Sequence, residues 1–184
     1  MKIIQTPLND LVIIDPKHFS DKRGFFLETF QEKRYQTMLK LDFCFVQDNL
    51  SRSSKNVLRG LHYQLQQPQA KLVTVIRGSI FDVAVDLRKT SATFGKWFGT
   101  ILNDENHHQL FIPKGFAHGF CVISDWVDFH YKCSDYYDPS TELGILWSDP
   151  NLGITWPIQN PILSEKDRNY PCLNNLSREL LFNN

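Results

Sequence analysis

Alternating apolar and polar residues dominate the middle of the chain. In segment 79–87, every second residue from Phe81 to Leu87 is apolar, and Asp82 and Asp86 lie between them. A period of two places successive side chains on opposite faces of an extended chain, so this segment predicts a half-buried strand. Similar runs occupy residues 43–48, 57–64, 71–76, 96–102, 109–112, 117–123, 127–132 and 143–147. Many short strands separated by Gly, Pro, Asn and Asp predict an all-β sandwich or barrel.

Helical signals are few and short. Residues 32–39 predict two helical turns. Ser164 and Asp167 resemble a capping box, with Asp in place of the usual Glu, and Pro171 is expected to stop that helix within two turns. The chain shows no internal repeat or shift in composition, so residues 1–184 are expected to form a single domain. No pattern ties down residues 174–184, and we expect this tail to be frayed.

Composition narrows the class of protein. Lys plus Arg and Asp plus Glu number 20 each. A neutral chain has no long-range field to attract nucleic acid or an acidic membrane, so an anionic ligand must be held by a local basic cluster. No signal-peptide pattern and no long apolar segment are found. The four scattered cysteines then predict reduced thiols and a cytoplasmic location.

The strand at 57–64 carries Arg59, His62 and Gln64. Strict alternation places His62 and Gln64 on one face and Arg59 on the other, unless Gly60 marks a bulge that redirects Arg59. On this cluster alone, a structural histidine beside a surface arginine explains the pattern as well as a functional site does.

The segment 113–118 has the form PxGxxH and resembles the second motif of cupins. The first cupin motif requires a second histidine where Gln64 stands, followed by a glutamate, and together they bind a metal. No glutamate lies between His62 and Gly78, and the charged residues there are Lys71 and Arg77. Cations repel a divalent metal, so we expect a cupin-like barrel without one.

Further polar residues are weak signals one at a time. Tyr131 is predicted to face inward from strand 127–132, where a buried tyrosine needs a hydrogen-bond partner and could also donate a proton. The segments 21–28, 47–49 and 164–167 separately suggest a turn, a solvated strand edge and a helix cap.

The order of these clusters, from about residue 3 to residue 173, resembles the dTDP-4-dehydrorhamnose 3,5-epimerase family. The motifs are DxRGFFxExF at 21–30, FVQDN at 45–49, SSKxVLRGLHYQ at 53–64, AKLVxVxxGxxFDVAVDLR at 70–88, FGKW at 94–97, IPxGFAHGF at 112–120, YKxxxYY at 131–137 and LSEKD at 163–167. The combination is highly specific, although no single motif is.

The resemblance implies a cupin-type jelly-roll barrel with a few short peripheral helices, a homodimer, and no cofactor or metal. It implies that dTDP-4-dehydro-6-deoxy-D-glucose is epimerised at C3 and C5 to dTDP-4-dehydro-L-rhamnose, in dTDP-L-rhamnose synthesis. By motif match, His62 is the general base, Asp167 its partner, Tyr131 the proton donor and Lys71 the group near the enolate. The implied substrate contacts are Arg23, Phe26, Glu28, Gln47, Asn49, Arg59, His118, Tyr137, Glu142 and Lys166, with Tyr137 stacking on thymine.

The implied chemistry suits these residue types. Removing a proton beside the C4 ketone is feasible because charge spreads onto oxygen as an enolate, which needs a preorganised cation or donor. A neutral histidine is a suitable base near pH 7, and a carboxylate on its other nitrogen fixes the tautomer. Asp167 fills that role only if the short C-terminal helix folds over the barrel mouth. Arg59 and Arg23 are expected to bind the diphosphate, with segment 23–28 serving the neighbouring subunit.

Several alternatives remain at this point. A 3- or 5-mono-epimerase differs only subtly around Tyr131. A 3,4-ketoisomerase would carry a second histidine where Gln64 stands, and Gln64 also argues against a metal-dependent cupin. A non-catalytic, metal-free sugar-binding cupin is disfavoured because a pure binder needs no base and acid on opposite sides of its ligand.

Overall fold

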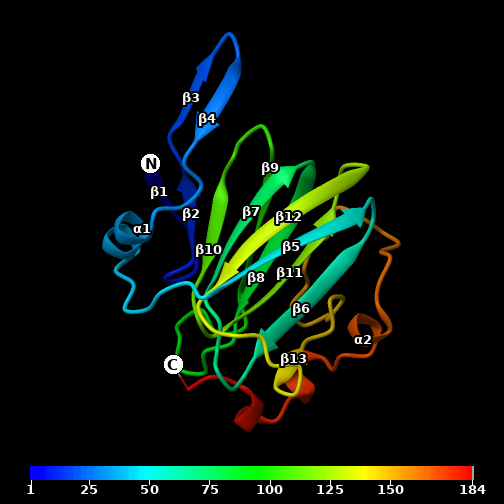
Figure 1. Ribbon diagram of the computed structural model, residues 1–184. Coiled ribbons are helices and arrows are strands. Elements are labelled where there is room, and N and C mark those ends of the chain that lie inside the picture. Colours follow the sequence, from blue (N-terminus) through cyan, green and yellow to red (C-terminus); the bar gives the residue numbers. More distant parts are fainter. Residues whose placement is uncertain (184) are drawn as a thin grey trace.

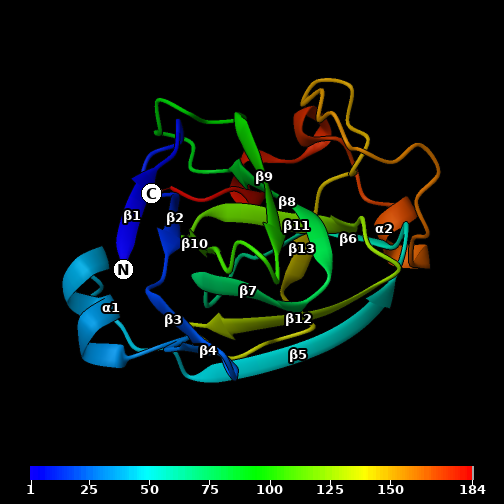
Figure 2. The ribbon, with the colours of Figure 1, turned by 90° about the horizontal axis from the view of Figure 1, so that it is seen from above.

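The computed structural model describes residues 1–183, whose strands form two facing sheets and one separate hairpin (Figure 1). The first sheet has the order β1 (Lys2–Gln5), β2 (Val12–Asp15), β10 (Gln109–Ile112), β7 (Lys71–Arg77), β12 (Trp126–Cys133) and β5 (Gln47–Ser54). The second has the order β13 (Glu142–Gly144), β6 (Leu58–Gln64), β11 (Phe116–Val122), β8 (Ser79–Asp86) and β9 (Trp97–Asn103). Strand neighbours within each sheet run antiparallel, and the view from above shows two stacked layers (Figure 2). The predicted all-β jelly-roll architecture is confirmed.

The space between the sheets holds the main hydrophobic core. Ile80 and Ala84 of β8 face it, together with Val73, Val75 and Phe129 of the opposite sheet. The other face of β8 is also covered, because the C-terminal segment packs over it. The expectation of a half-buried strand at 79–87 is therefore wrong. The residues in this second cluster include Val83, Val85, Leu87, Ile145, Leu152, Leu173, Leu181 and Phe182.

The C-terminal tail is packed as far as it is described. It contains two short 3-10 helices, η1 (Leu173–Asn175) and η2 (Arg178–Leu180), and the side chains of Leu181 and Phe182 are buried. Phe182 also bridges to Arg88 through the backbone. The expectation of a frayed tail is thus corrected for residues 174–183, because burial of Leu181 and Phe182 ties the chain down. Asn184 lies outside the described residues.

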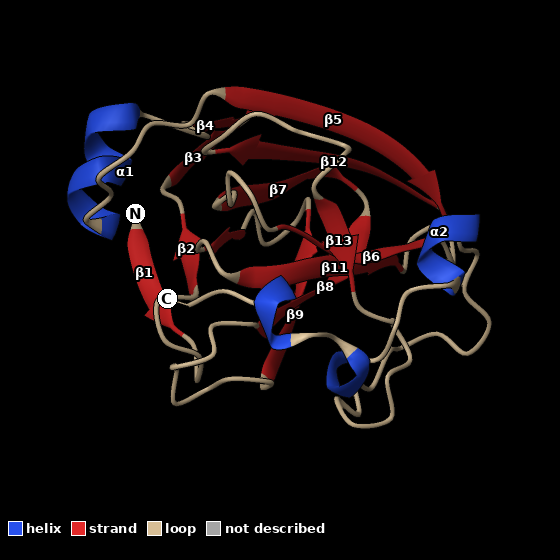
Figure 3. Cartoon of the chain, turned by 90° about the horizontal axis from the view of Figure 1, so that it is seen from below, coloured by secondary structure: helices blue, strands red, loops and turns tan. Residues whose placement is uncertain are grey.

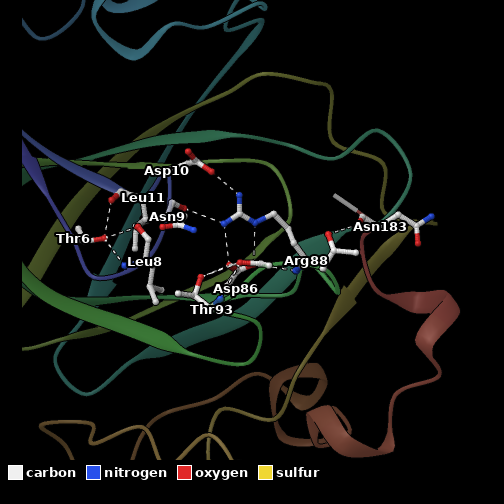
Figure 4. A network of polar contacts seen from close by, with 11 residues as sticks. Thr6, Leu8, Asn9, Asp10, Leu11, Asp86, Arg88, Thr93 and Asn183 are labelled. Carbon is white, nitrogen blue, oxygen red and sulfur yellow. Dashed lines mark hydrogen bonds and ion pairs between the residues drawn. The ribbon is translucent and has the colours of Figure 1, made fainter.

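Arg88 links the N-terminal loop to a buried carboxylate at the end of β8 (Figure 4). Its guanidinium donates to Asp86 at 2.9 Å and to Asp10 at 2.8 Å. Asp86 is fully buried and also accepts hydrogen bonds from Ser91 and Thr93. These hydrogen bonds outweigh the burial that opposes ionisation and lower the pKa of Asp86. The ion pair therefore joins the N-terminal loop to the end of β8.

Two α-helices lie at opposite sides of the molecule, outside the sheets (Figure 3). Helix α1 (Glu32–Leu39) matches the predicted range and buries Tyr35 against the first sheet. Helix α2 (Glu165–Arg168) starts at Ser164, whose hydroxyl accepts the backbone N–H of Asp167 at 3.1 Å. Both predicted helices are confirmed. The cap at Ser164 fixes the position of Asp167 in the first turn of α2.

A hairpin of β3 (His18–Asp21) and β4 (Gly24–Leu27) projects away from both sheets (Figure 1). Rings of His18 and Phe25 contact His107 of the loop after β9, at centroid distances of 5.6 and 4.6 Å. Phe25 and Phe26 are 59% and 69% exposed. Most of the surface of both rings is therefore left uncovered by this chain.

Candidate active site

Two adjoining hollows open between the sheets, beside β6, β7, β12 and β13. Their volumes are about 340 Å³ and about 240 Å³. Both are lined by His62, Lys71, Tyr131 and Glu142, so they form one continuous site. The other sequence-predicted residues in these linings are Gln47, Asn49, Arg59, His118, Tyr137, Lys166 and Asp167. Segments that are far apart in sequence thus converge as the motif match implied.

A bulge at Gly60, the alternative to strict alternation, places Arg59 and His62 in the same cavity. His118 pairs with His62 and Phe120 pairs with Arg59, so β6 carries one extra residue relative to β11. Gly60 has φ +122°, and a Cβ there would lie 2.5 Å from Gly119 Cα. Only glycine fits this close approach without strain. The bulge offsets the alternation that would otherwise send Arg59 to the opposite face.

His62 and Asp167 form a close pair across 105 residues of sequence. The ring Nε2 lies 2.5 Å from Asp167 Oδ1, and Ser164 Oγ donates to Oδ2 at 2.8 Å. Burial opposes ionisation of Asp167, but the hydrogen bonds from His62 and Ser164 lower its pKa. Asp167 is thus an ionised acceptor near neutral pH, and Nε2 of His62 carries the proton that it accepts. Nδ1 is the ring nitrogen left to act as a base.

Tyr170 supports the other side of the His62 ring. The two rings meet edge to face, with centroids 5.7 Å apart and an interplanar angle of 67°. Gly144 pairs with His62 across β13 and β6, and a Cβ on Gly144 would lie 2.5 Å from the Tyr170 ring. Burial, followed by the charge of Glu142, raises the pKa of Tyr170 to about 12. Sequence reasoning missed Tyr170, and only its proximity to the LSEKD motif could have suggested it.

Tyr131 and Lys71 face the site from neighbouring strands. The Lys71 ammonium lies 6.0 Å from the centroid of the Tyr131 ring. Burial lowers the pKa of Lys71, although the charges of Cys133, Glu142 and Asp82 oppose that shift. Burial raises the pKa of Tyr131, so its phenol holds its proton at neutral pH. The cavity therefore contains a proton donor and a cation as well as an imidazole base.

His118 is held by Asp82, one of the two carboxylates that interrupt the apolar residues of segment 79–87. Its Nε2 lies 3.0 and 2.9 Å from the two oxygens of Asp82, which is fully buried. The His118 ring lies over Phe129 at 6.2 Å. Asp82 and His118 sit on adjacent strands, so no spacing in the sequence reveals this pairing. Asp82 fixes the orientation in which His118 meets the cavity.

A series of hydrogen-bonded side chains lines the opening of the site. Gln47 donates to Asn49 at 3.0 Å and accepts the backbone N–H of Tyr137 at 3.0 Å. The Tyr137 hydroxyl donates to Glu142 at 3.1 Å, and Lys166 contacts the same carboxylate oxygen. Burial opposes ionisation of Glu142, but Lys166 and His62 lower its pKa. Tyr137 itself is 51% exposed.

Arg23, Phe26 and Glu28 are the predicted site residues that this chain does not bring to the cavity. Arg23 and Phe26 lie on the projecting hairpin, where Arg23 pairs with Asp21 at 2.6 Å. Glu28 follows the hairpin and pairs with Arg34 of α1. Within one chain these residues cannot contact a ligand held between His62 and Tyr131.

Gln64 holds the backbone of a loop at the opening of the cavity. Its amide donates to the carbonyls of Gln67 and Tyr136, and its oxygen accepts the N–H of Asp138 at 2.8 Å. The side chain thus anchors the loop that carries Tyr137.

Within residues 1–183, no group of three or more His, Cys, Asp or Glu side chains is arranged to hold a metal. No helix in the described part of the chain is long and apolar enough to cross a membrane.

Comparison with known proteins gives consistent similarities. The family model described as dTDP-4-dehydrorhamnose 3,5-epimerase matches residues 5–175. A dTDP-4-dehydrorhamnose 3,5-epimerase of Shigella flexneri is 54% identical over 170 residues, covering 92% of this chain and 94% of the relative. The crystal structure of dTDP-6-deoxy-D-glucose-3,5-epimerase from Legionella pneumophila Philadelphia 1, in complex with dTDP-4-keto-L-rhamnose, has a TM-score of 0.97 and 54% identity, covering 100% and 98% of the two chains. A dTDP-4-dehydrorhamnose 3-epimerase of Streptomyces niveus is 42% identical over 156 residues, covering 84% and 75%.

Proposed function

Because this chain belongs to the dTDP-4-dehydrorhamnose 3,5-epimerase family, we propose that it inverts C3 and C5 of dTDP-4-dehydro-6-deoxy-D-glucose to give dTDP-4-dehydro-L-rhamnose. The protein is an isomerase of dTDP-rhamnose synthesis. One observation carries the mechanism: the His62–Asp167 pair lines the same cavity as Tyr131 and Lys71. The match of the family model to residues 5–175 supports a single epimerase domain.

His62 removes the proton from the carbon next to the C4 ketone. Asp167 accepts a hydrogen bond from Nε2–H at 2.5 Å, which leaves the Nδ1 lone pair for the substrate. When Nδ1 takes the proton, the imidazolium that forms is stabilised by the adjacent carboxylate. Asp167 is buried, so this attraction is screened less than it would be at the surface.

Lys71 stabilises the enolate oxygen that develops at C4. Its amino group lines the cavity and lies beside the ring of Tyr131. A cation held in place before the reaction needs no reorganisation as negative charge appears on the substrate. The same site performs both inversions because C3 and C5 each flank C4 and give enolates with the same oxygen.

Tyr131 returns a proton to the opposite face of the carbon. It projects from β12, in the first sheet, whereas His62 projects from β6 in the second. A sugar ring between the two sheets therefore has the base on one face and the phenol on the other. Proton loss to one face and gain from the other inverts the centre without redox change.

The remaining cavity residues bind the dTDP portion. Arg59 is positioned for the diphosphate, because a planar guanidinium pairs well with phosphate oxygens, and His118 is a further substrate contact. Tyr137, half-exposed at the mouth, is the aromatic surface for thymine. Gln47, Asn49, Glu142 and Lys166 supply polar contacts around the mouth.

A homodimer completes the site in this proposal. The hairpin carries a guanidinium at Arg23 and the exposed rings of Phe25 and Phe26, yet it contributes nothing to its own cavity. We infer that Arg23, Phe26 and Glu28 serve the site of a second copy. In a mixed dimer, Arg23→Ala in one subunit is then expected to impair the other subunit's site. Impairment confined to the mutated subunit's own site contradicts the exchange.

A cytoplasmic location is part of the proposal. Cys44, Cys121, Cys133 and Cys172 are all free thiols. A reducing compartment maintains that state.

The test is proton NMR of dTDP-4-dehydro-6-deoxy-D-glucose with the pure protein in heavy water. Deuterium at both C3 and C5 is expected. A mono-epimerase, the activity named for the Streptomyces niveus relative, would exchange one carbon only. Tight binding with no exchange would favour a non-catalytic sugar-binding cupin and refute the enzyme.

A further inference from the structure

Each inversion in the proposed reaction leaves His62 and Tyr131 in the wrong protonation states for the next one. The substrate C–H proton ends on His62, and the phenol proton of Tyr131 ends on carbon. Before the second carbon can react by the same steps, His62 must lose a proton and Tyr131 must regain one. The route by which His62 loses this proton can be inferred from its neighbours, if the proposed function is taken as given.

Two carboxylates flank the His62 ring, and they differ in their access to water. Asp167 holds Nε2, and its side chain is 5% exposed. Its second oxygen accepts from Ser164, so both oxygens are occupied within the protein. Asp167 fixes the ring but offers no path to solvent.

Glu142 lies on the other side and reaches the surface. Its Oε1 is 4.0 Å from Nδ1, the nitrogen that receives the substrate proton. Its Oε2 accepts from the hydroxyl of Tyr137 at 3.1 Å and contacts the Lys166 ammonium. Tyr137 is 51% exposed, and the Lys166 side chain is 50% exposed. Glu142 therefore connects the reacting nitrogen with groups in contact with water.

We propose that Glu142 is a proton relay that carries the proton from Nδ1 of His62 to solvent between the two inversions. The Nδ1–H bond breaks, an O–H bond forms on Oε1, and the proton then passes to water at the mouth. Tyr131 regains a proton from water in the cavity, so each inversion is neutral overall. The 4.0 Å gap exceeds a hydrogen bond, so transfer uses one bridging water or an approach of about 1 Å.

The surroundings of Glu142 suit a transient carrier. Although burial opposes ionisation, Lys166 and His62 lower the pKa of Glu142, so it is ionised near neutral pH and readily releases a proton transferred to it. Its negative charge also contributes to the raised pKa of Tyr131, after burial and Cys133, which favours reprotonation of the phenolate. The charge of Glu142 thus favours the return of a proton to Tyr131, and its carboxylate gives the proton on His62 an acceptor that leads to water.

The test is Glu142→Gln, which keeps the size and polarity of the side chain but removes its base. At saturating substrate in dilute buffer, we expect kcat to fall about 10- to 100-fold, at the low end of general acid–base effects. Adding imidazole at constant pH and ionic strength should restore kcat about tenfold or more, because a small base replaces the relay. Wild-type kcat should not respond to imidazole.

Two further variants separate a relay from other roles. Glu142→Asp keeps the carboxylate but lengthens the gap, so kcat is expected between those of wild type and Glu142→Gln. Asp167→Asn disables the base itself, and imidazole in solution should not restore it. Thermal melting of each variant checks that it is folded.

The outcomes distinguish the relay from the reaction. A Glu142→Gln enzyme with raised KM and unchanged kcat, or with a kcat loss that imidazole never restores, overturns the relay and leaves Glu142 as a substrate contact. A wild-type enzyme that exchanges neither the C3 nor the C5 proton overturns the proposed function, and the relay with it.

Discussion

Replacing Asp167 with asparagine is expected to remove most of the activity while leaving substrate binding largely intact. Asp167 Oδ1 lies 2.5 Å from Nε2 of His62, and only 3% of the residue is exposed. The asparagine amide can present an N–H to the ring, which favours the tautomer with its proton on Nδ1. The base nitrogen would then already be occupied before the substrate binds.

The magnitude follows from two losses that act on the same step. The wrong tautomer must be reversed before reaction, and the imidazolium loses a buried counter-charge. Together they are expected to lower kcat about 10²- to 10⁴-fold, the range typical of general acid–base groups. KM should change little, because the buried Asp167 carboxylate is occupied by His62 and Ser164 rather than by substrate.

The assay is initial-rate kinetics of product formation by NMR, with Asp167→Glu as a matched control. The glutamate keeps the charge but displaces it by one methylene, so it should retain more activity than the asparagine variant. An asparagine variant with wild-type kcat would refute the assignment of Asp167 as partner of the base. Equal losses of kcat in both variants would show that packing, and not charge, is what the site requires at this position.

Three further predictions concern Lys71 and Arg88. Lys71→Met should lower kcat about 10²- to 10³-fold, the usual loss of one donor to an oxyanion, and a kcat within twofold of wild type would exclude Lys71 from enolate stabilisation. Arg88→Ala leaves the buried Asp86 carboxylate without its cation and should cost about 3–5 kcal/mol in unfolding free energy; urea denaturation measures it, and a loss below about 1 kcal/mol would contradict the buried-pair argument. Because the folded-state pKa of Asp86 is lowered, the stability that this carboxylate contributes is complete above about pH 4 and is lost as the pH falls further. Arg88→Ala should therefore weaken the decrease in stability below about pH 4, as measured by thermal melting. An unchanged decrease would refute this prediction.

The sequence predicted elements well where hydrophobic periodicity reflects burial. It failed at β5, for which the pattern predicts a strand at residues 43–48, whereas the strand is Gln47–Ser54. Phe43 and Phe45 pack near α1 outside any strand. The inward face of β5 is polar because Gln47, Asn49 and Ser51 line the cavity. A strand that faces a functional cavity carries no apolar signal on that side.

The site was predictable as a set of residues but not as a geometry. The family motifs named His62, Lys71, Tyr131 and Asp167, and the structure brings them to one cavity. Periodicity alone assigned Arg59 to the wrong face, since the effect of Gly60 depends on its close approach to another strand. Partnerships between strands, such as Asp82 with His118, arise from register that no local pattern specifies.

In the proposed mechanism, the base His62 and the acid Tyr131 approach opposite faces of one sugar ring. Proton NMR of Tyr131→Phe in heavy water, following deuterium incorporation and configuration at C3 and C5 together, tests it most directly. We expect that His62 still exchanges these protons for deuterium with retention, while inversion is slower by about 10²-fold or more. Inversion that keeps pace with exchange in this variant would rule out Tyr131 as the acid on the opposite face.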